Sequence, residues 1–378
     1  MIEAWLVFAV STLASGAVLV GMWLAARRYG PVRDAVTVRV HVAGTRGKTT
    51  TARLIGAGLA AGGRRVVVKT TGTDPLVVLP DGAVVAWPRG APASISELGR
   101  FFRLARGVGA DAAVIESMAI EPEYLWASER YLVRATHLVV TNLRPDHAEV
   151  LPTDAKAAAR AVAELVPAGG RVFVTEEAAE PALIEACGAA GASVERVTTE
   201  GLASDAANRR LALIVCGALG VAPEAAREAM AAALPDPGQF FLAEVEGPWG
   251  RWRFASAFAC NDTVSFAALW AEHRPAGAPV VLLNARADRP LRTRAFLSLL
   301  ATLEPPVRLV ISGAAPLRWA RAAGFPDGRT ARLRARSAAG AIEELAAAAG
   351  PEGTVWGVAN YAGIGAAIVR HLRRAGRC

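Results

Sequence analysis

The sequence has few cysteines, few aromatic residues and almost no lysine. The four cysteines are Cys187, Cys216, Cys260 and Cys378. No pair has the spacing of metal ligands or of a redox motif, so neither a zinc site nor a disulfide framework is indicated. Aromatic residues make up 6% of the chain and are not interleaved with basic clusters. Nucleic-acid binding therefore rests on the net charge of +8 alone and is not expected.

Charged residues are missing from one long segment near the N-terminus. Residues 4–26 contain none, and 23 residues are enough to span a bilayer. Trp5 and Trp23 lie near the two ends, where interfacial aromatics are typical. Arginines follow at Arg27, Arg28 and Arg33. We predict a transmembrane anchor over residues 1–30, with the N-terminus outside and the body in the cytoplasm by the positive-inside rule. A cleaved signal peptide and a buried helix are the alternatives.

Only three lysines occur, and one of them stands in the most informative segment. The apolar run 38–42 leads into Gly44-Thr-Arg-Gly-Lys-Thr-Thr50, and a helical pattern follows. A strand, a glycine turn and a helix start in this order form a phosphate-binding loop. Lys48 can reach the β- and γ-phosphates of ATP or GTP, and the Thr49 hydroxyl can ligate Mg²⁺. The loop is shorter than the usual pattern, because Val42 stands where the first glycine is expected. A plain glycine turn is the alternative.

Strands and helices alternate along the rest of the chain. Strands are expected at 36–42, 65–68, 112–115, 136–141, 172–175 and 193–197, with helices between them. Alternation of this kind predicts an α/β fold with a parallel sheet covered by helices. Two prolines and a glycine at 234–239 indicate a break. We therefore predict a P-loop ATPase domain at 31–236 and a smaller Rossmann-like domain at 237–378.

Polar side chains follow several of the expected strands, where ligands bind in parallel sheets. Glu116 ends one such strand near the loop, and a carboxylate there suits Mg²⁺. Asn142, Asp146 and His147 follow the next one. His147 is either a metal ligand or a polar cap on the loop. The predicted metal ligands are Thr49, Glu116 and His147.

Two further groups of polar residues are candidates for substrate or nucleotide contacts. The segment after the second strand offers Lys69, Thr70, Thr71, Thr73 and Asp74, which we predict to bind substrate; a β-turn is the alternative. In the second half, candidate nucleotide contacts are Asn261, Asp262, Asn284, Arg286, Asp288 and Arg289. Asn, Asp and Arg clusters also commonly cap loops, so this second signal is weak.

Taken together, these motifs resemble the Mur ligase superfamily, which includes the peptidoglycan amide ligases and folylpolyglutamate synthase. Within that superfamily, the chain most resembles the membrane-anchored B subunits of poly-γ-glutamate synthases (PgsB/CapB type). The strings that carry this resemblance are Gly44–Lys48, Lys69–Asp74, Glu116–Ile120 and Asn142–His147. Looser similarity continues through 284–289 and 360–365. The resemblance covers nearly the whole chain.

The resemblance implies an ATP- and Mg²⁺-dependent amide ligase that phosphorylates a glutamate γ-carboxylate, after which the amine of another glutamate attacks the acyl phosphate. Its implied catalytic residues are Lys48, Arg46, Glu116 and His147. The nucleotide would be bound by Gly44, Thr45, Arg46, Gly47, Lys48, Thr49, Thr50 and Asn142, with the second-half residues named above. Implied partners are glutamate, the growing poly-γ-glutamate chain and small membrane subunits. A homo-oligomer stays open.

The chain departs from the superfamily in two respects. No lysine follows Lys156, so the carbamoylated lysine that bridges metal in several Mur ligases is not expected. The domain that binds UDP-linked precursors is missing, and the uncharged segment takes its place. Two other functions stay open: a ligase of this type for a different amino acid, and a nucleotide-binding subunit that gates a membrane export complex without making bonds.

Overall fold

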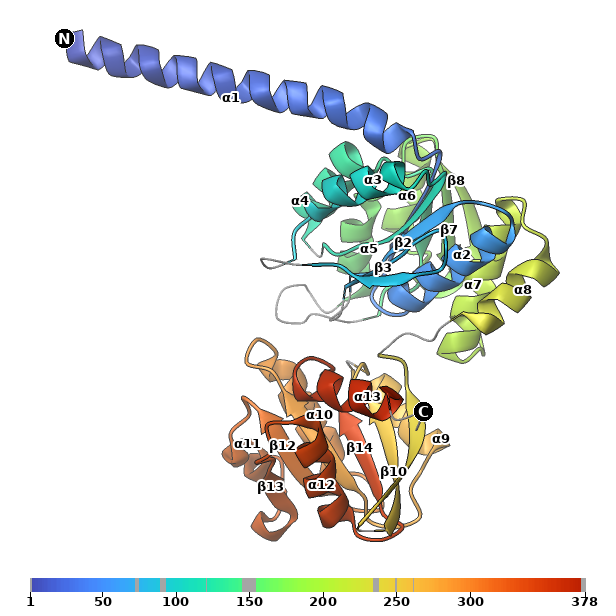
Figure 1. Ribbon diagram of the computed structural model, residues 1–378, viewed down its shortest axis with the longest axis vertical. Helices are drawn as coiled ribbons and strands as arrows, with labels where there is room; N and C mark the ends of the chain where they lie inside the picture. Colours follow the sequence, from blue (N-terminus) through green and yellow to red (C-terminus); the bar gives the residue numbers. More distant parts are fainter. Residues whose placement is uncertain are drawn as a thin grey trace. The chain divides into compact units, whose positions relative to one another are not determined.

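The computed structural model describes residues 2–71, 75–88, 93–119, 121–144, 154–233, 238–248, 250–260 and 262–374. These residues form two compact units, one up to residue 233 and the other from residue 238 onward. Each unit is a sheet covered by helices, as drawn in Figure 1. The α/β class predicted from the sequence is confirmed, and the sheets are mixed rather than wholly parallel.

The first unit contains an eight-stranded sheet in the order β4-β3-β2-β5-β1-β6-β7-β8. From that edge, the strands are Val84–Ala86, Leu76–Val78, Val66–Lys69, Ala112–Glu116, Val38–Ala43, His137–Val140, Arg171–Thr175 and Ser193–Val197. The last six run parallel, whereas β3 and β4 add an antiparallel hairpin that the sequence analysis did not predict.

Helices cover both faces of this sheet. They are α2 (Lys48–Ala61), α3 (Glu97–Gly107), α4 (Pro122–Ala127), α5 (Ala155–Ala163), α6 (Pro181–Ala189), α7 (Ser204–Ala218) and α8 (Pro223–Ala232). Successive side chains of β2 point to opposite faces, so Val66 and Val68 pack in the core of α2, α7 and α8, while Val67 packs in the core of α3. Burial on both faces explains why the central strands are continuously apolar.

The second unit contains a six-stranded sheet in the order β13-β12-β11-β14-β10-β9. These strands are Thr330–Arg332, Arg308–Gly313, Val280–Ala285, Thr354–Val358, Gly250–Ala257 and Phe241–Gly247. Only β9 runs antiparallel among them. The helices are α9 (Thr263–Glu272), α10 (Pro290–Leu300), α11 (Leu317–Ala322), α12 (Ala338–Ala349) and α13 (Ile364–Arg374). The chain leaves β11 toward β12 and returns to its other side at β14, which creates a topological switch point.

The N-terminal segment is one continuous helix, α1 (Ile2–Asp34), seen in Figure 1. Its last turn packs on α3, where the rings of Tyr29 and Phe102 lie 6.3 Å apart. Leu13, Val18 and Leu19 are more than half exposed. The transmembrane span predicted over residues 1–30 is not found: within the described residues, every helix falls short of the length or apolar character that a bilayer crossing requires.

Candidate active site

The loop between β1 and α2 has the backbone geometry of an anion-binding turn. Gly44 has a φ of 119° and Gly47 a φ of 77°, values that favour glycine. A side chain at Gly44 would collide with Thr141 and place its Cβ 2.8 Å from the carbonyl oxygen of Asn142. At Gly47, a Cβ would collide with the side chain of Asn208. Both glycines are therefore required by conformation and by space.

Residues that follow β6 hold this loop in place. The Oδ1 atom of Asn142 accepts hydrogen bonds from the Thr45 hydroxyl (2.6 Å) and the Arg46 N–H (3.1 Å). The Asn142 amide nitrogen donates to the Arg46 carbonyl (3.0 Å), and the Thr141 hydroxyl donates to the same oxygen (2.5 Å). Asn142, predicted from the sequence to bind nucleotide, thus fixes the shape of the loop that would do so.

Lys48 is the first residue of α2, and its side chain folds back over the loop. Its ammonium group donates to the carbonyl oxygens of Gly44 (2.8 Å) and Thr45 (3.3 Å). This places the cation beside the N-terminus of α2, where the backbone N–H groups and the helix dipole also favour an anion. The predicted residues Thr49 and Thr50 continue the first turn of α2.

Glu116 and Thr49 form a pair beside the loop. The Thr49 hydroxyl lies 3.0 Å from each carboxylate oxygen of Glu116, and the Thr71 N–H donates to one of them over 2.7 Å. The pairing of β1 with β5 sets Glu116 opposite Val42, just before the loop, and leaves it 4% exposed. A hydroxyl and a carboxylate beside a phosphate-binding turn fit Mg²⁺, which prefers hard oxygen ligands and retains waters.

Three predicted site residues near this pair have other partners. The Lys69 side chain is fully buried, and its ammonium lies 2.9 Å from Glu97 and 5.5 Å from the centre of the Trp87 ring. The Thr70 hydroxyl accepts from the Leu76 N–H over 3.2 Å. Thr71 contributes its backbone N–H to Glu116, as described above. Three further residues, Thr73, Asp74 and His147, lie outside the described residues, as does Asp146.

A cavity of about 450 Å³ opens on the other side of the loop, at the ends of β6, β7 and β8. Its lining includes Arg46, Thr141, Thr175, Glu176 and Asn208. Asn208, which the sequence analysis missed, comes from the first turns of α7, and its Oδ1 accepts from the Thr51 hydroxyl over 3.3 Å. The available signal was its helical spacing from buried apolar residues, because Leu211, Ala212 and Val215 follow it by three, four and seven positions. Ligands of parallel sheets bind at the carboxyl ends of the strands, which is where this cavity lies.

The second unit has its own group of polar residues at the switch point between β11 and β14. The Asn284 amide donates to the carbonyls of Asn360 (2.6 Å) and Ala362 (2.7 Å), and the Asn360 amide donates to the Asn284 carbonyl (2.7 Å). These bonds join the loops that follow the two strands. A cavity of about 450 Å³ lies there, with Arg286 and Arg336 in its lining.

The remaining predicted residues of this unit contact side chains or backbone groups that are close to them in the sequence. Arg286 donates two hydrogen bonds to Asp288 (2.8 and 2.7 Å), and these hold the pKa of Asp288 below its usual value. Arg289 lies 3.8 Å from the same carboxylate. Asp262 is the N-cap of α9 and accepts from the Ser265 N–H. Asn261 lies outside the described residues.

Comparisons with known proteins agree with this organisation. Residues 42–213 match the Mur ligase middle domain, and residues 243–375 match the poly-gamma-glutamate synthase CapB C-terminal domain. The PGA synthase CapB of Bacillus subtilis (strain 168) is 30% identical over 302 residues, which cover 75% of this chain and 76% of that protein.

Solved structures show the same fold at lower identity. Mycobacterium tuberculosis folylpolyglutamate synthase, solved with ADP and AMPPCP, matches with a TM-score of 0.68 and 19% identity, covering 93% of this chain and 96% of that one. A bifunctional folylpolyglutamate synthase/dihydrofolate synthase with Mn, AMPPNP and L-glutamate bound matches with a TM-score of 0.63 and 16% identity, covering 93% of each chain.

Proposed function

Because this chain belongs to the CapB family and is a Mur-ligase-type ATP-dependent amide ligase, we propose that it joins glutamate units into poly-γ-glutamate. The observation that carries the proposal is the Thr49–Glu116 pair beside a loop whose two glycines leave no room for side chains. ATP is the proposed energy source and Mg²⁺ the proposed metal. The folylpolyglutamate synthase structures with ATP analogues, Mn and L-glutamate support these substrates by analogy.

The proposed reaction has two steps. An oxygen of the glutamate γ-carboxylate attacks the γ-phosphorus of ATP, which forms an acyl phosphate and releases ADP. The amine of a second glutamate then attacks the acyl carbon, loses a proton, and expels phosphate together with the oxygen that came from the carboxylate. The loop N–H groups, Lys48 and Arg46 stabilise the charge on the transferred phosphoryl group.

Within the described residues, the proposed metal ligands are Thr49 and Glu116, which would hold Mg²⁺. The third predicted ligand, His147, lies outside the described residues. When bound, the ion neutralises charge on the phosphates and orients them. Thr71 holds the Glu116 carboxylate through its N–H, so it positions the ligand. We also propose that the cavity beside Asn208 takes the ribose and base.

The cavity of the second unit suits an anionic group. Arg286 and Arg336 belong to its lining, and it lies at the carboxyl ends of parallel strands. Arginine forms paired hydrogen bonds with carboxylates and phosphates. We propose that Asn284, Arg286, Asp288 and Arg289 serve substrate binding in this unit, through the nucleotide phosphates or a glutamate carboxylate.

Membrane attachment through α1 is part of the proposal. The support is the uncharged segment 4–26 and the exposure of apolar side chains such as Leu13 and Leu19 at 74% and 66%. Exposed apolar side chains along a helix favour transfer to lipid. Small membrane subunits are the proposed partners, with the catalytic body in the cytoplasm, where ATP is available.

The proposal is tested with membranes that carry the full chain and its neighbouring membrane subunits. ADP release and γ-linked product are measured with ATP and Mg²⁺, with and without L- or D-glutamate. We expect ADP release to depend on one isomer and to match amide formation. ADP release that depends on another amino acid would identify that amino acid as the substrate. Nucleotide binding without ADP release would favour a subunit that gates export and forms no bonds.

A further inference from the structure

We propose that the surface formed by α4 and the π-helix that follows it (Ser128–Val133) binds the headgroup layer of an anionic lipid bilayer. This surface, which we call the α4 patch, is on the catalytic unit and is separate from the phosphate loop. The inference rests on the proposed insertion of α1, and it adds a second, reversible membrane contact made by the body of the enzyme.

The α4 patch exposes three large aromatic side chains. Tyr124, Trp126 and Tyr131 are 56%, 44% and 58% exposed, and the rings of Trp126 and Tyr131 meet edge to face at 5.3 Å. Buried aromatics are common, but exposed aromatics gathered on one segment indicate an interaction surface. Tyrosine and tryptophan combine an apolar ring with a polar tip, which is why they gather where hydrocarbon meets water.

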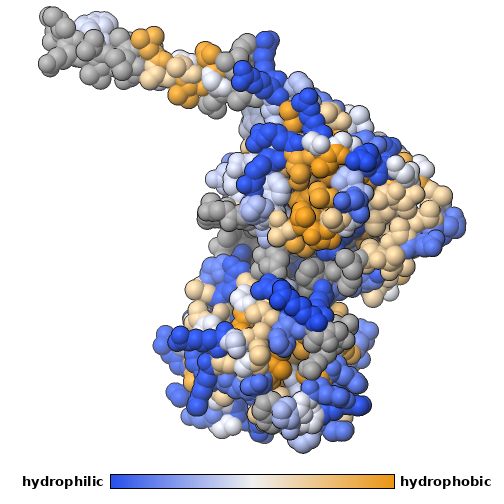
Figure 2. Space-filling view, in the orientation of Figure 1, coloured by the Kyte–Doolittle hydropathy of each residue, from blue (hydrophilic) through white to orange (hydrophobic). Residues whose placement is uncertain are grey.

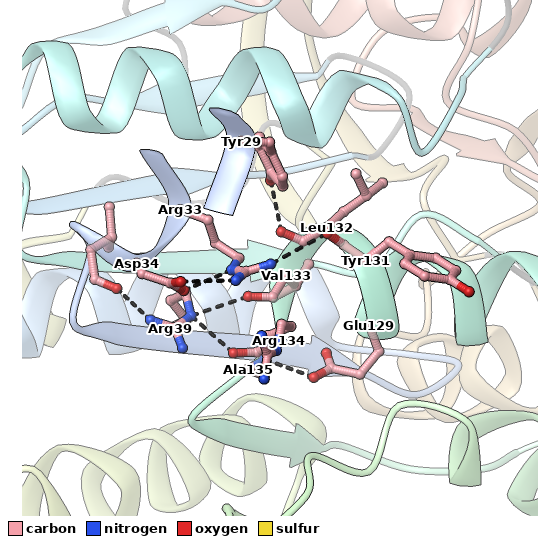
Figure 3. Close-up of polar contacts among 11 residues, drawn as sticks. Tyr29, Arg33, Asp34, Arg39, Glu129, Tyr131, Leu132, Val133, Arg134 and Ala135 are labelled. Carbon is pink, nitrogen blue, oxygen red and sulfur yellow. Dashed lines mark hydrogen bonds and ion pairs between the residues drawn. The ribbon is translucent and has the colours of Figure 1, made fainter. Parts of the chain in front are cut away.

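Hydrogen bonds tie the α4 patch to the last turn of α1. The Tyr29 hydroxyl donates to the Leu132 carbonyl over 2.7 Å, and Arg33 donates to the Tyr131 carbonyl over 3.4 Å. Figure 3 shows both contacts, with the Tyr131 ring pointing away from the polar cluster. The patch therefore keeps a fixed place beside this end of the helix.

That place is close to the expected edge of the bilayer. Tyr29 is three residues beyond Ala26, where the uncharged segment ends, and three helical residues rise about 5 Å. Headgroup layers extend several ångströms beyond the hydrocarbon on each side. With the uncharged segment 4–26 of α1 embedded in lipid, the backbone bonded to Tyr29 lies at headgroup depth, within reach of the Trp126 and Tyr131 side chains.

The charges around the base of α1 complement anionic lipid. Exposed arginines of the described residues here are Arg27, Arg28, Arg103, Arg130 and Arg134. The carboxylate of Asp34 is paired with Arg33, and that of Glu129 is buried against the Ala135 N–H and His41. The exposed carboxylates of Glu121 and Glu123 offset part of the positive charge of these arginines. Figure 2 shows hydrophilic surface beside apolar surface near this end of α1. This excess of arginine favours a lipid surface over a purely apolar protein partner.

The test uses the full chain in vesicles, with an environment-sensitive fluorophore on Trp126→Cys. Cys260 and Cys378 are replaced by serine, while Cys187 and Cys216 are buried and stay. The matched control carries the probe on Val194→Cys, a half-exposed position on β8. Lipids bearing a nitroxide quencher are added to vesicles with or without phosphatidylglycerol, and flotation reports membrane attachment. A probe on Tyr131→Cys gives a second reading.

We expect the probes at 126 and 131 to be quenched at least about threefold more than the probe at 194, in anionic vesicles only. We expect Arg130→Gln to lower the ratio of lipid-bound to unbound α4 patch about fivefold, because a single arginine strengthens binding to an anionic surface by about that factor. If the probes at 126 and 194 are quenched equally in a chain that still floats with the vesicles, the lipid contact of the α4 patch is ruled out. Membrane attachment through α1 is then still supported by the flotation. A chain that does not float overturns both, while glutamate-dependent ADP release reports the ligase separately.

Discussion

Lys48 is the residue on which charge stabilisation in the site depends most. We expect Lys48→Ala to lower glutamate-dependent ADP release at least about 100-fold, because a preorganised cation acting on the transferred phosphoryl group is lost. Folding is expected to persist, since the bonds from the ammonium to the Gly44 and Thr45 carbonyls lie within the loop itself. Lys156→Ala, on the exposed side of α5, is the matched control. Comparable turnover in the two variants would rule out the proposed role.

Glu116 is expected to determine how the enzyme responds to Mg²⁺. Glu116→Gln keeps the shape and an acceptor for the Thr49 hydroxyl, but removes the charge that a divalent ion needs. We predict a higher Mg²⁺ concentration for half-maximal turnover and little loss of stability, because a buried carboxylate is replaced by a neutral amide. Magnesium titrations of ADP release check this. An unchanged magnesium profile would show that Glu116 holds no metal.

Lys69 is a residue for which sequence and structure lead to different expectations. The sequence pattern around Lys69 predicts a substrate contact, whereas the ammonium is buried against Glu97. Because removing one partner leaves the other buried and charged, we expect Lys69→Met to lower the free energy of unfolding by about 3–5 kcal/mol. Urea denaturation measures this, and Lys69→Met with Glu97→Leu is expected to recover much of the loss. A raised KM for glutamate at unchanged stability would favour the substrate role instead.

The phosphate loop offers a matched pair of glycines at the scale of one element. Gly47 and Gly63 precede and follow α2 with φ values of 77° and 84°, but only Gly47 faces a neighbouring side chain. We expect alanine at either position to destabilise the fold by about 1 kcal/mol, the cost of the left-handed conformation. Only Gly47→Ala should also abolish nucleotide binding, because its Cβ displaces the loop or Asn208.

Calorimetric titration with ADP and an ATP analogue distinguishes the two variants. Gly47→Ala combined with Asn208→Ala is expected to regain part of the binding, since the collision is relieved. Equal binding by Gly47→Ala and Gly63→Ala would mean that the loop does not hold the phosphates.

The elements that could be predicted from the sequence are those whose own residues carry the signal. The strand before Gly44 and the helix after Gly47 follow from an apolar run, two glycines and a helical pattern, and Glu116 follows from its place at the end of a buried strand. The β3–β4 hairpin escaped prediction because its strands have three residues each, too few for alternation to be read. Asn208 escaped prediction because it contacts Thr51 from a helix 157 residues farther along the chain, and such proximity depends on tertiary packing.

At the scale of the whole molecule, the site and the membrane attachment are separable. The loop, Glu116 and the cavity beside Asn208 all lie within the first unit. Deletion of residues 1–26 keeps Tyr29 and Arg33, whose bonds hold the end of α1 on the body. We expect this variant to bind ADP as the full chain does, but to lose flotation with vesicles. Misfolding of the shortened chain would show that the segment belongs to a core.

If ATP drives amide formation through an acyl phosphate at this loop, one oxygen atom of the glutamate γ-carboxylate must leave with the phosphate, and isotope labelling detects that transfer. Glutamate labelled with ¹⁸O in its γ-carboxyl group is supplied with ATP and Mg²⁺ to membranes carrying the full chain and its partner subunits, and the phosphate released is analysed by mass spectrometry. We expect one ¹⁸O atom in phosphate for each amide bond formed, and at least about 100-fold less labelled phosphate from Lys48→Ala membranes. Unlabelled phosphate, or label that appears in AMP, would contradict the acyl-phosphate mechanism.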